Sequence, residues 1–107
     1  MTSHSKTDMS TPFGLHPEYV STIERIVLGQ PGVEKAVIFG SRAKGTFHSG
    51  SDVDIALYGR LSQTDAGHVQ NQLNENTLIP LFFDVVVYDL ISNPSLREHI
   101  DRVGKPL

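Results

Sequence analysis

A chain of 107 residues is long enough for one hydrophobic core and too short for two, so we expect a single domain. The formal charge of −3 provides no overall basic field, which disfavours generic binding to DNA or RNA. With 38% hydrophobic residues, no apolar run near the roughly 20 residues of a membrane span and no cysteine, the composition excludes membrane proteins, disulfide frameworks and thiolate chemistry.

The chain begins with a polar stretch rich in serine and threonine. We expect residues 1–12 to form a disordered tail and residues 13–107 to form the domain. The tail lacks a positively charged segment leading into an apolar one, so it does not resemble a secretory signal. We therefore expect the protein in the cytoplasm.

The first two predicted elements are a helix and a buried strand. Apolar residues at helical spacing predict the helix over residues 17–28. The β-rich run from Val33 to Phe39 predicts the strand, and a short turn or helix follows from Ser41 to about Gly45. The strand therefore leads directly into a tight turn.

The next two predicted elements are a half-buried strand and a helix. From Ser51 to Tyr58 apolar residues alternate with polar or small ones, as in a strand that buries one face. Thr64 or Asp65 is expected to cap a helix that runs to about Asn76. This helix is predicted to cover one face of the sheet.

The last third of the chain carries its strongest strand signal. The run from Leu81 to Tyr88 is apolar except for Asp84. Asn93 is placed as the N-cap of a final helix that ends at Gly104. The order of elements predicts an α/β fold, with a small mixed sheet flanked by helices.

Three aspartates on two predicted strands form the candidate catalytic and metal site. Asp52 and Asp54 are two residues apart, so in a strand they share a face with Cα atoms about 6.5 to 7 Å apart. Asp84 on a neighbouring strand would complete a cluster that is unfavourable unless a cation neutralises it. Mg²⁺ prefers such oxygen ligands, as one ion or as a pair about 3.5 to 4 Å apart. The pattern indicates phosphoryl or nucleotidyl transfer.

A candidate nucleotide-binding turn precedes these acids. Gly40 permits close approach of the backbone, and Ser41 can cap the following short helix. Backbone N–H groups there, with the Ser41 hydroxyl and Arg42, are expected to bind the terminal phosphates. Ser51, directly before the acids, is assigned to the same nucleotide-binding set.

Less specific interpretations of the same residues stay open at this point. A pair of aspartates two residues apart is common among solvent-exposed acids, and Asp84 alone also fits a water-facing acid on an edge strand. Arg42 and Lys44 also fit solvated surface charges. None of the five histidines has zinc-type spacing, and only His48 is near the site in sequence.

The motifs resemble those of the polymerase-β-like nucleotidyltransferase superfamily. They are Gly40-Ser41, a spacer of ten residues, Asp52-Val53-Asp54 and a later strand acid at Asp84. The string GSRAKGTFHSGSDVDIAL is similar to the minimal nucleotidyltransferases, small antitoxin-type proteins often paired with a separately encoded helical HEPN partner. The resemblance covers the chain from about residue 17 onward.

The resemblance implies a role for each matching residue. Gly40 and Ser41 would bind the triphosphate, and Asp52 and Asp54 would bind both metals, or one metal and the nucleotide. Asp84 would be the general base or a ligand of the catalytic metal. One or two Mg²⁺ ions and a nucleoside triphosphate, with ATP favoured, are the implied cofactor and substrate.

Two hypotheses about function follow from the sequence. The first is transfer of a nucleoside monophosphate, with AMP from ATP favoured, to an acceptor hydroxyl on a HEPN-type partner, as an antitoxin. The second is a non-catalytic binding module that neutralises a helical partner by forming a complex with it. A third, a detached domain that modifies a small molecule, is disfavoured because no substrate-binding domain is present.

Overall fold

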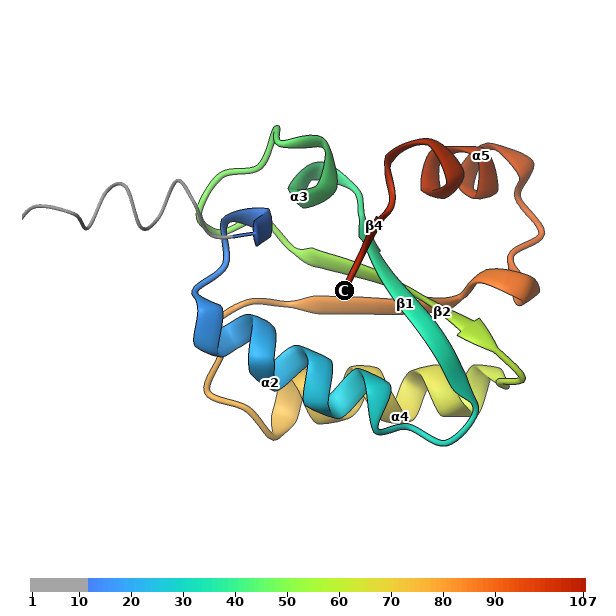
Figure 1. Ribbon diagram of the computed structural model, residues 1–107, viewed down its shortest axis with the longest axis horizontal. Helices are drawn as coiled ribbons and strands as arrows, with labels where there is room; N and C mark the ends of the chain where they lie inside the picture. The colour runs from blue at the N-terminus through green and yellow to red at the C-terminus, as the bar shows by residue number, and fades with distance from the viewer. Residues whose placement is uncertain (1–11) are drawn as a thin grey trace, which may run out of the picture.

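The computed structural model describes residues 12–107 (Figure 1). The predicted tail over residues 1–12 falls outside this part of the chain, except for Pro12. Two 3₁₀ turns accompany four helices and four strands in the order η1 (Pro12–Gly14), α2 (Pro17–Leu28), β1 (Val33–Phe39), α3 (Ser41–Lys44), β2 (Val53–Gly59), α4 (Gln63–Glu75), β3 (Phe83–Val87), η2 (Tyr88–Leu90), α5 (Pro94–Val103) and β4 (Lys105–Pro106).

The four strands form one open mixed sheet in the order β3-β2-β1-β4. Strand β1 pairs antiparallel with β2 and with β4, whereas β2 and β3 run parallel. The parallel pair needs a crossover, and α4 provides it. The predicted α/β class with a small mixed sheet and flanking helices is confirmed.

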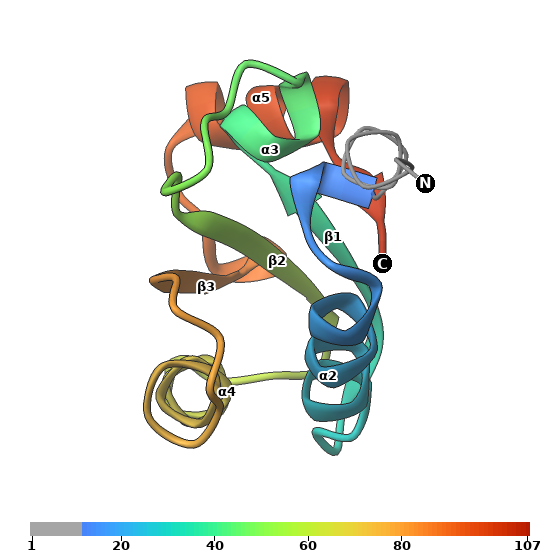
Figure 2. The same ribbon diagram turned by 90° about the vertical axis from the view of Figure 1, so that its left-hand side faces the viewer.

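Helices lie on both faces of the sheet. In Figure 2, α2 and α4 lie on one side of it, and α3 and α5 lie on the other. The main core forms where β1, β2 and β3 pack on α2 and α4, and includes fully buried Ile23, Ile55, Leu73 and Phe83. A smaller core under α5 includes Val37, Phe39, Ala56 and Ile100.

Most predicted helix boundaries are observed, and one cap differs. The N-cap of α4 is Ser62, whose side chain accepts a hydrogen bond from the Asp65 N–H, while the Asp65 carboxylate accepts one from the Ser62 N–H. The expected cap at Thr64 or Asp65 is therefore wrong, because this reciprocal pair starts the helix earlier. The predicted cap at Asn93 is confirmed by hydrogen bonds from two backbone N–H groups of α5.

The sheet contains one strand that the sequence analysis did not predict. Strand β4 has only two residues, one of them proline, and it adds to β1 at the sheet edge. Such a short segment carries no periodicity, so only its tertiary contact with β1 reveals it. Strands β2 and β3 are also slightly shorter at their starts than expected, beginning at Val53 and Phe83.

The outer edge of β3 is closed by two side chains of α4. Asn74 donates through Nδ2 to the Phe83 carbonyl at 3.1 Å and accepts from the Phe83 N–H at 2.8 Å. Gln70 accepts a hydrogen bond from the Val85 N–H, also at 2.8 Å. These backbone groups would otherwise be unpaired at the edge of the sheet.

Helix α5 is fixed to the sheet by an aromatic and ionic cluster. The rings of Tyr58 and Tyr88 stack with centroids 4.7 Å apart. The Tyr88 hydroxyl donates to Asp101 at 2.6 Å, and Arg97 donates to the Tyr88 carbonyl at 3.3 Å. Both charged residues belong to α5, so the cluster sets the position of this helix over the sheet. Across residues 12–107, none of the helices combines the length and apolar character needed to cross a membrane.

Candidate functional site

Strand register places two of the three predicted acids next to each other. Asp54 of β2 is the direct partner of Asp84 in β3, and neighbouring strands lie about 4.8 Å apart. Val53 and Ile55 are fully buried in the main core, so Asp54 between them faces the opposite side of the sheet. Asp84 is exposed on this open side. The expected meeting of acids from two strands is observed for this pair.

The electrostatics of Asp54 show that negative charge gathers at this point. Burial raises the pKa of Asp54, and the nearby carboxylates of Asp84 and Asp52 raise it further. His99 acts in the opposite direction and lowers it. The ionised form of Asp54 is thus less favoured than in a solvent-exposed aspartate, and a positive charge close to it would oppose this effect.

The turn after β1 brings Gly40 directly against Asp54. Gly40 has φ 73° and ψ −155°, a conformation essentially restricted to glycine. A Cβ atom at this position would overlap Oδ2 of Asp54. The Gly40 carbonyl accepts hydrogen bonds from the N–H groups of Ala43 and Lys44, and these bonds start α3. The predicted Gly40-Ser41 turn and Asp54 are therefore immediate neighbours.

The structure gives Arg42 a different role from the predicted phosphate contact. Its side chain is only 3% exposed. The guanidinium donates to the carbonyls of Ser51 at 3.0 Å, Ser49 at 3.1 Å and Phe13 at 2.9 Å, with a longer contact to Gly14 at 3.5 Å. These bonds occupy most of the N–H donors of the guanidinium. Arg42 therefore joins the loop before the acids to the turn η1, which is called the N-terminal turn below.

The loop from residue 45 to 52 is also closed by Ser51. The Ser51 hydroxyl accepts a hydrogen bond from the His48 N–H at 2.9 Å, and its carbonyl is bound by Arg42. Asp52 follows at once and is exposed. Burial lowers the pKa of Arg42, and the negative charge of Asp52 partly offsets this effect, so the two residues lie close enough to interact.

His99 is a candidate site residue that the sequence analysis missed. It lies on α5 with its ring edge-on to Phe39, at a centroid distance of 6.1 Å. Phe39 is the direct strand partner of Asp54, which explains the influence of His99 on that carboxylate. The only signal in the sequence is its place next to buried Ile100, on the flank of the apolar stripe of α5.

The acids supply a suitable donor set for Mg²⁺, although they are not drawn together around one point. Within residues 12–107, no group of three or more histidine or acidic side chains stands ready to hold a metal ion. Carboxylate oxygens are nevertheless the ligands that Mg²⁺ prefers, and Mg²⁺ retains several waters when one or two carboxylates bind it. A bound cation would also relieve the repulsion that raises the pKa of Asp54.

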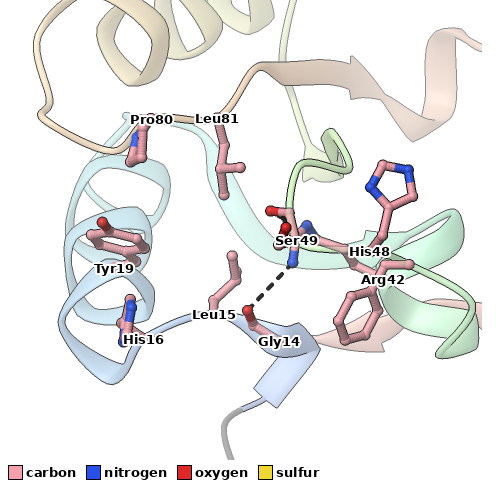
Figure 3. A pocket seen from close by; sticks show the side chains of 10 residues that line it. Gly14, Leu15, His16, Tyr19, Arg42, His48, Ser49, Pro80 and Leu81 are labelled. Atoms are coloured by element: carbon pink, nitrogen blue, oxygen red, sulfur yellow. Dashed lines mark hydrogen bonds between the residues drawn. The ribbon is translucent and has the colours of Figure 1, made fainter. Parts of the chain in front are cut away.

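Two hollows in the surface lie beside the loop that Arg42 holds. The first, of about 550 Å³, is lined by residues of the N-terminal turn, α2 and that loop, including Tyr19, Phe47 and His48 (Figure 3). None of the three acids lines it. The second is an open groove of about 510 Å³ whose walls include Asp52 and Phe82. Of these two hollows, only the second has one of the three acids, Asp52, in its lining.

Comparison of the sequence with family models gives one match. The model described as polymerase beta, nucleotidyltransferase, matches residues 21–107, which contain the whole acidic site and the Gly40-Ser41 turn. No curated protein matches the sequence.

Solved structures with a similar fold include toxin–antitoxin complexes. The chain is 22% identical to one in a toxin–antitoxin crystal structure with AMP-PNP, with a TM-score of 0.66 over 86% of this chain and 72% of that one. It is 17% identical to a chain in a complex of tri-AMPylated Shewanella oneidensis HEPN toxin with MNT antitoxin (TM-score 0.64; 83% and 68% covered).

A third similar structure is described as a candidate minimal nucleotidyltransferase. It is 25% identical, with a TM-score of 0.57 over 84% of this chain and 86% of that one. The fold, the acids on β2 and β3 and the family match all agree with each other. The chain belongs to the polymerase β nucleotidyltransferase family.

Proposed function

We propose that this protein transfers a nucleoside monophosphate, with AMP from ATP favoured, to a hydroxyl group on a HEPN-type partner protein in the cytoplasm. The observation that carries the proposal is the alignment of Asp54 with Asp84 directly against the Gly40 turn. The HEPN toxin in the Shewanella oneidensis complex is tri-AMPylated, which supports AMP as the transferred group. As an antitoxin, the protein would act by modifying its partner.

In this proposal the Gly40-Ser41 turn binds the triphosphate. Glycine leaves the backbone open to close approach by a phosphate, and the Ser41 hydroxyl can donate a hydrogen bond to it. Ser51 and Arg42 contribute indirectly, because their hydrogen bonds fix the loop that ends at Asp52. The two sides of the nucleotide site are then the turn and the acids.

Metal binding and proton transfer are assigned to the three acids Asp52, Asp54 and Asp84. Asp52 and Asp54 would hold one or two Mg²⁺ ions, which offset the charge of the phosphates and of the transition state. Asp84 is exposed on the outermost strand, so an acceptor can reach it from solvent. Its carboxylate would accept the proton of the attacking hydroxyl, and the hydroxyl oxygen would displace pyrophosphate from the α-phosphorus of ATP.

The test is a transfer assay with α-labelled ATP, Mg²⁺ and the HEPN-type protein encoded beside this one. Asp54→Asn and Asp84→Asn should each reduce labelling of the partner by at least about 100-fold, the range typical for loss of an acid–base group. Asp89→Asn is the matched control, because Asp89 is an exposed acid on η2 and should leave labelling unchanged. Undiminished transfer by both site variants would refute the assigned chemistry.

A second candidate is a binding module that neutralises the partner by complex formation alone. It is favoured by the absence, within the described residues 12–107, of a ready-made cluster of metal ligands. The double variant Asp52→Asn/Asp54→Asn separates the two functions. If it still binds and neutralises the partner as well as the native protein does, neutralisation does not require transfer.

A further inference from the structure

The first of the two hollows described above lies apart from the three acids and is called the Arg42 pocket below. Its volume of about 550 Å³ is within the range of roughly 300–1,000 Å³ in which small-molecule sites are found. Figure 3 shows Tyr19 of α2 on one side of it, Arg42 and Ser49 on the opposite side, and Leu81 pointing into the space between them. The pocket is therefore large enough for a ligand of its own.

The backbone beside the Arg42 pocket is held in a strained conformation. Phe13 has φ 62°, in the left-handed region that residues with a side chain rarely adopt. The Arg42 guanidinium binds the Phe13 carbonyl at 2.9 Å, and a Cβ atom added to Gly14 would overlap the ring of Phe47. Such strain persists where the surrounding structure enforces it, and it is concentrated at ligand sites. The walls of the pocket are thus fixed before a ligand binds.

Arg42 places a buried positive charge in the wall of the pocket. Its hydrogen-bond partners are neutral backbone carbonyls, and no ion pair within residues 12–107 includes it. Burial lowers the pKa of Arg42, and the negative charge of Asp52 offsets this only in part. Among the described residues that line the pocket, none is acidic. Because a buried charge is costly without an opposite charge, the pocket favours an anion.

The remaining walls favour a flat, apolar ring. Tyr19 and Phe47 both line the pocket, and the Arg42 guanidinium lies over the Phe47 ring at 5.1 Å from its centroid. The His16 ring meets Tyr19 edge-on at 5.1 Å, and Leu81 adds aliphatic surface. Aromatic rings stack on such surfaces, whereas a bare inorganic anion would leave them uncovered. A ligand that combines a ring with a negative group matches both kinds of wall.

We propose that the Arg42 pocket binds a small planar aromatic carboxylate. Its ring would pack on Tyr19 and Phe47, and its carboxylate would face Arg42. One arginine matches the single charge of a carboxylate better than the several charges of a nucleotide. This site is separate from the acids and does not depend on the proposed function.

The first test measures binding of 2-naphthoate by isothermal titration calorimetry, without metal or nucleotide. We expect a Kd of about 0.1–1 mM, which is typical for a ligand of this size. Two analogues each lack one property: 2-naphthamide has the ring without the charge, and cyclohexanecarboxylate has the charge without an aromatic ring. Both should bind at least about fivefold more weakly. Equal binding of either analogue, or displacement of 2-naphthoate by an equal concentration of AMP, would overturn the ligand class.

The second test locates the ligand with paired variants. Ser49 and Tyr19 line the pocket, and Ser49 is exposed, so its replacement should not disturb folding. Ser49→Glu adds a negative charge to the wall and should raise the Kd for 2-naphthoate at least about fivefold, while neutral Ser49→Gln should stay within about twofold of the native value. Tyr19→Ala should also weaken binding, and Tyr19→Phe should retain it.

Melting curves identify any variant that does not fold, and the Ser49 pair alone decides the question if Tyr19→Ala is one of them. An unchanged Kd in Ser49→Glu, or in a folded Tyr19→Ala, would show that 2-naphthoate binds elsewhere. Absence of binding to the native protein at about 10 mM 2-naphthoate would likewise overturn the proposal, since a preformed site of this volume should bind more tightly than that.

Discussion

The contact between Gly40 and Asp54 gives the most specific prediction. In Gly40→Ala, the new Cβ has to adopt φ 73°, and it overlaps Oδ2 of Asp54. The backbone conformation alone costs on the order of 1–3 kcal/mol. Displacement of the carboxylate adds to this, so we expect a total loss of about 2–4 kcal/mol in the free energy of unfolding.

Two other glycines separate these contributions. Gly45 has φ 86° with no atom within 4 Å of an added Cβ, so Gly45→Ala measures backbone strain without a clash and should cost about 1–2 kcal/mol. Gly50 also has open space and no positive φ, so Gly50→Ala should be within about 0.5 kcal/mol of the native protein. Thermal melting should rank the variants in this order, since 1 kcal/mol shifts the Tm by about 4–8 °C in a domain of this size.

A double-mutant cycle then tests whether Asp54 causes the extra cost. In an Asp54→Ala background the clashing atoms are gone, and only the Asp54 Cβ remains, at 3.5 Å from the added methyl group, which is an ordinary contact. Gly40→Ala should therefore cost less in that background than in the native protein. Equal costs in both backgrounds would show that the carboxylate does not lie against the turn, and the site geometry would be wrong.

Three further predictions concern the hydrogen bonds and charges of the site. Arg42→Lys should lower the free energy of unfolding by about 2–4 kcal/mol, because lysine cannot replace the guanidinium bonds to the loop carbonyls, whereas exposed Lys44→Ala should have little effect in the same denaturant titration. Asp54→Asn should raise the Tm of the metal-free protein at neutral pH. The pKa of Asp54 is raised in the folded protein, so the native carboxyl group loses stability as the pH rises through that pKa. In melting curves recorded in EDTA from about pH 4 to 8, the gain in Tm should shrink toward acid pH, and a gain in Tm that is independent of pH would contradict this. Asn74→Ala should cost about 1–3 kcal/mol by leaving two backbone groups of β3 unpaired, and exposed Asn71→Ala on the same helix is the control; equal melting temperatures would argue against these bonds.

Much of the fold could be predicted because its signals are local. The helix over residues 17–28 and the strand from Val33 to Phe39 agree with α2 and β1 as observed. The pairing of Asp54 with Asp84 was also foreseeable. An acid inside an otherwise apolar strand is unusual, and a site shared with an acid on the neighbouring strand explains it. These elements depend on periodicity within a few residues, which a single sequence contains.

The role of Arg42 could not be foreseen in the same way. Its carbonyl partners at Phe13 and Gly14 lie 29 and 28 residues away in the chain, so only the folded structure brings them together. His99 shows the same limitation, since it joins the site through the packing of α5 on Phe39. The prediction that Ser51 binds the nucleotide stays a prediction, although its hydroxyl accepts a hydrogen bond within the loop.

The hydrogen bonds of Asn74 and Gln70 with the outer edge of β3 affect how another molecule can approach Asp84. Main-chain pairing of an incoming polypeptide with this edge is opposed at Phe83 and Val85, because their outward-facing N–H groups are already engaged. A side chain that approaches exposed Asp84 does not need these backbone groups. Recognition then depends on the side chain that the incoming polypeptide presents. The carboxylate of Asp84 stays accessible on the outermost strand, while the engaged backbone groups oppose edge-to-edge aggregation.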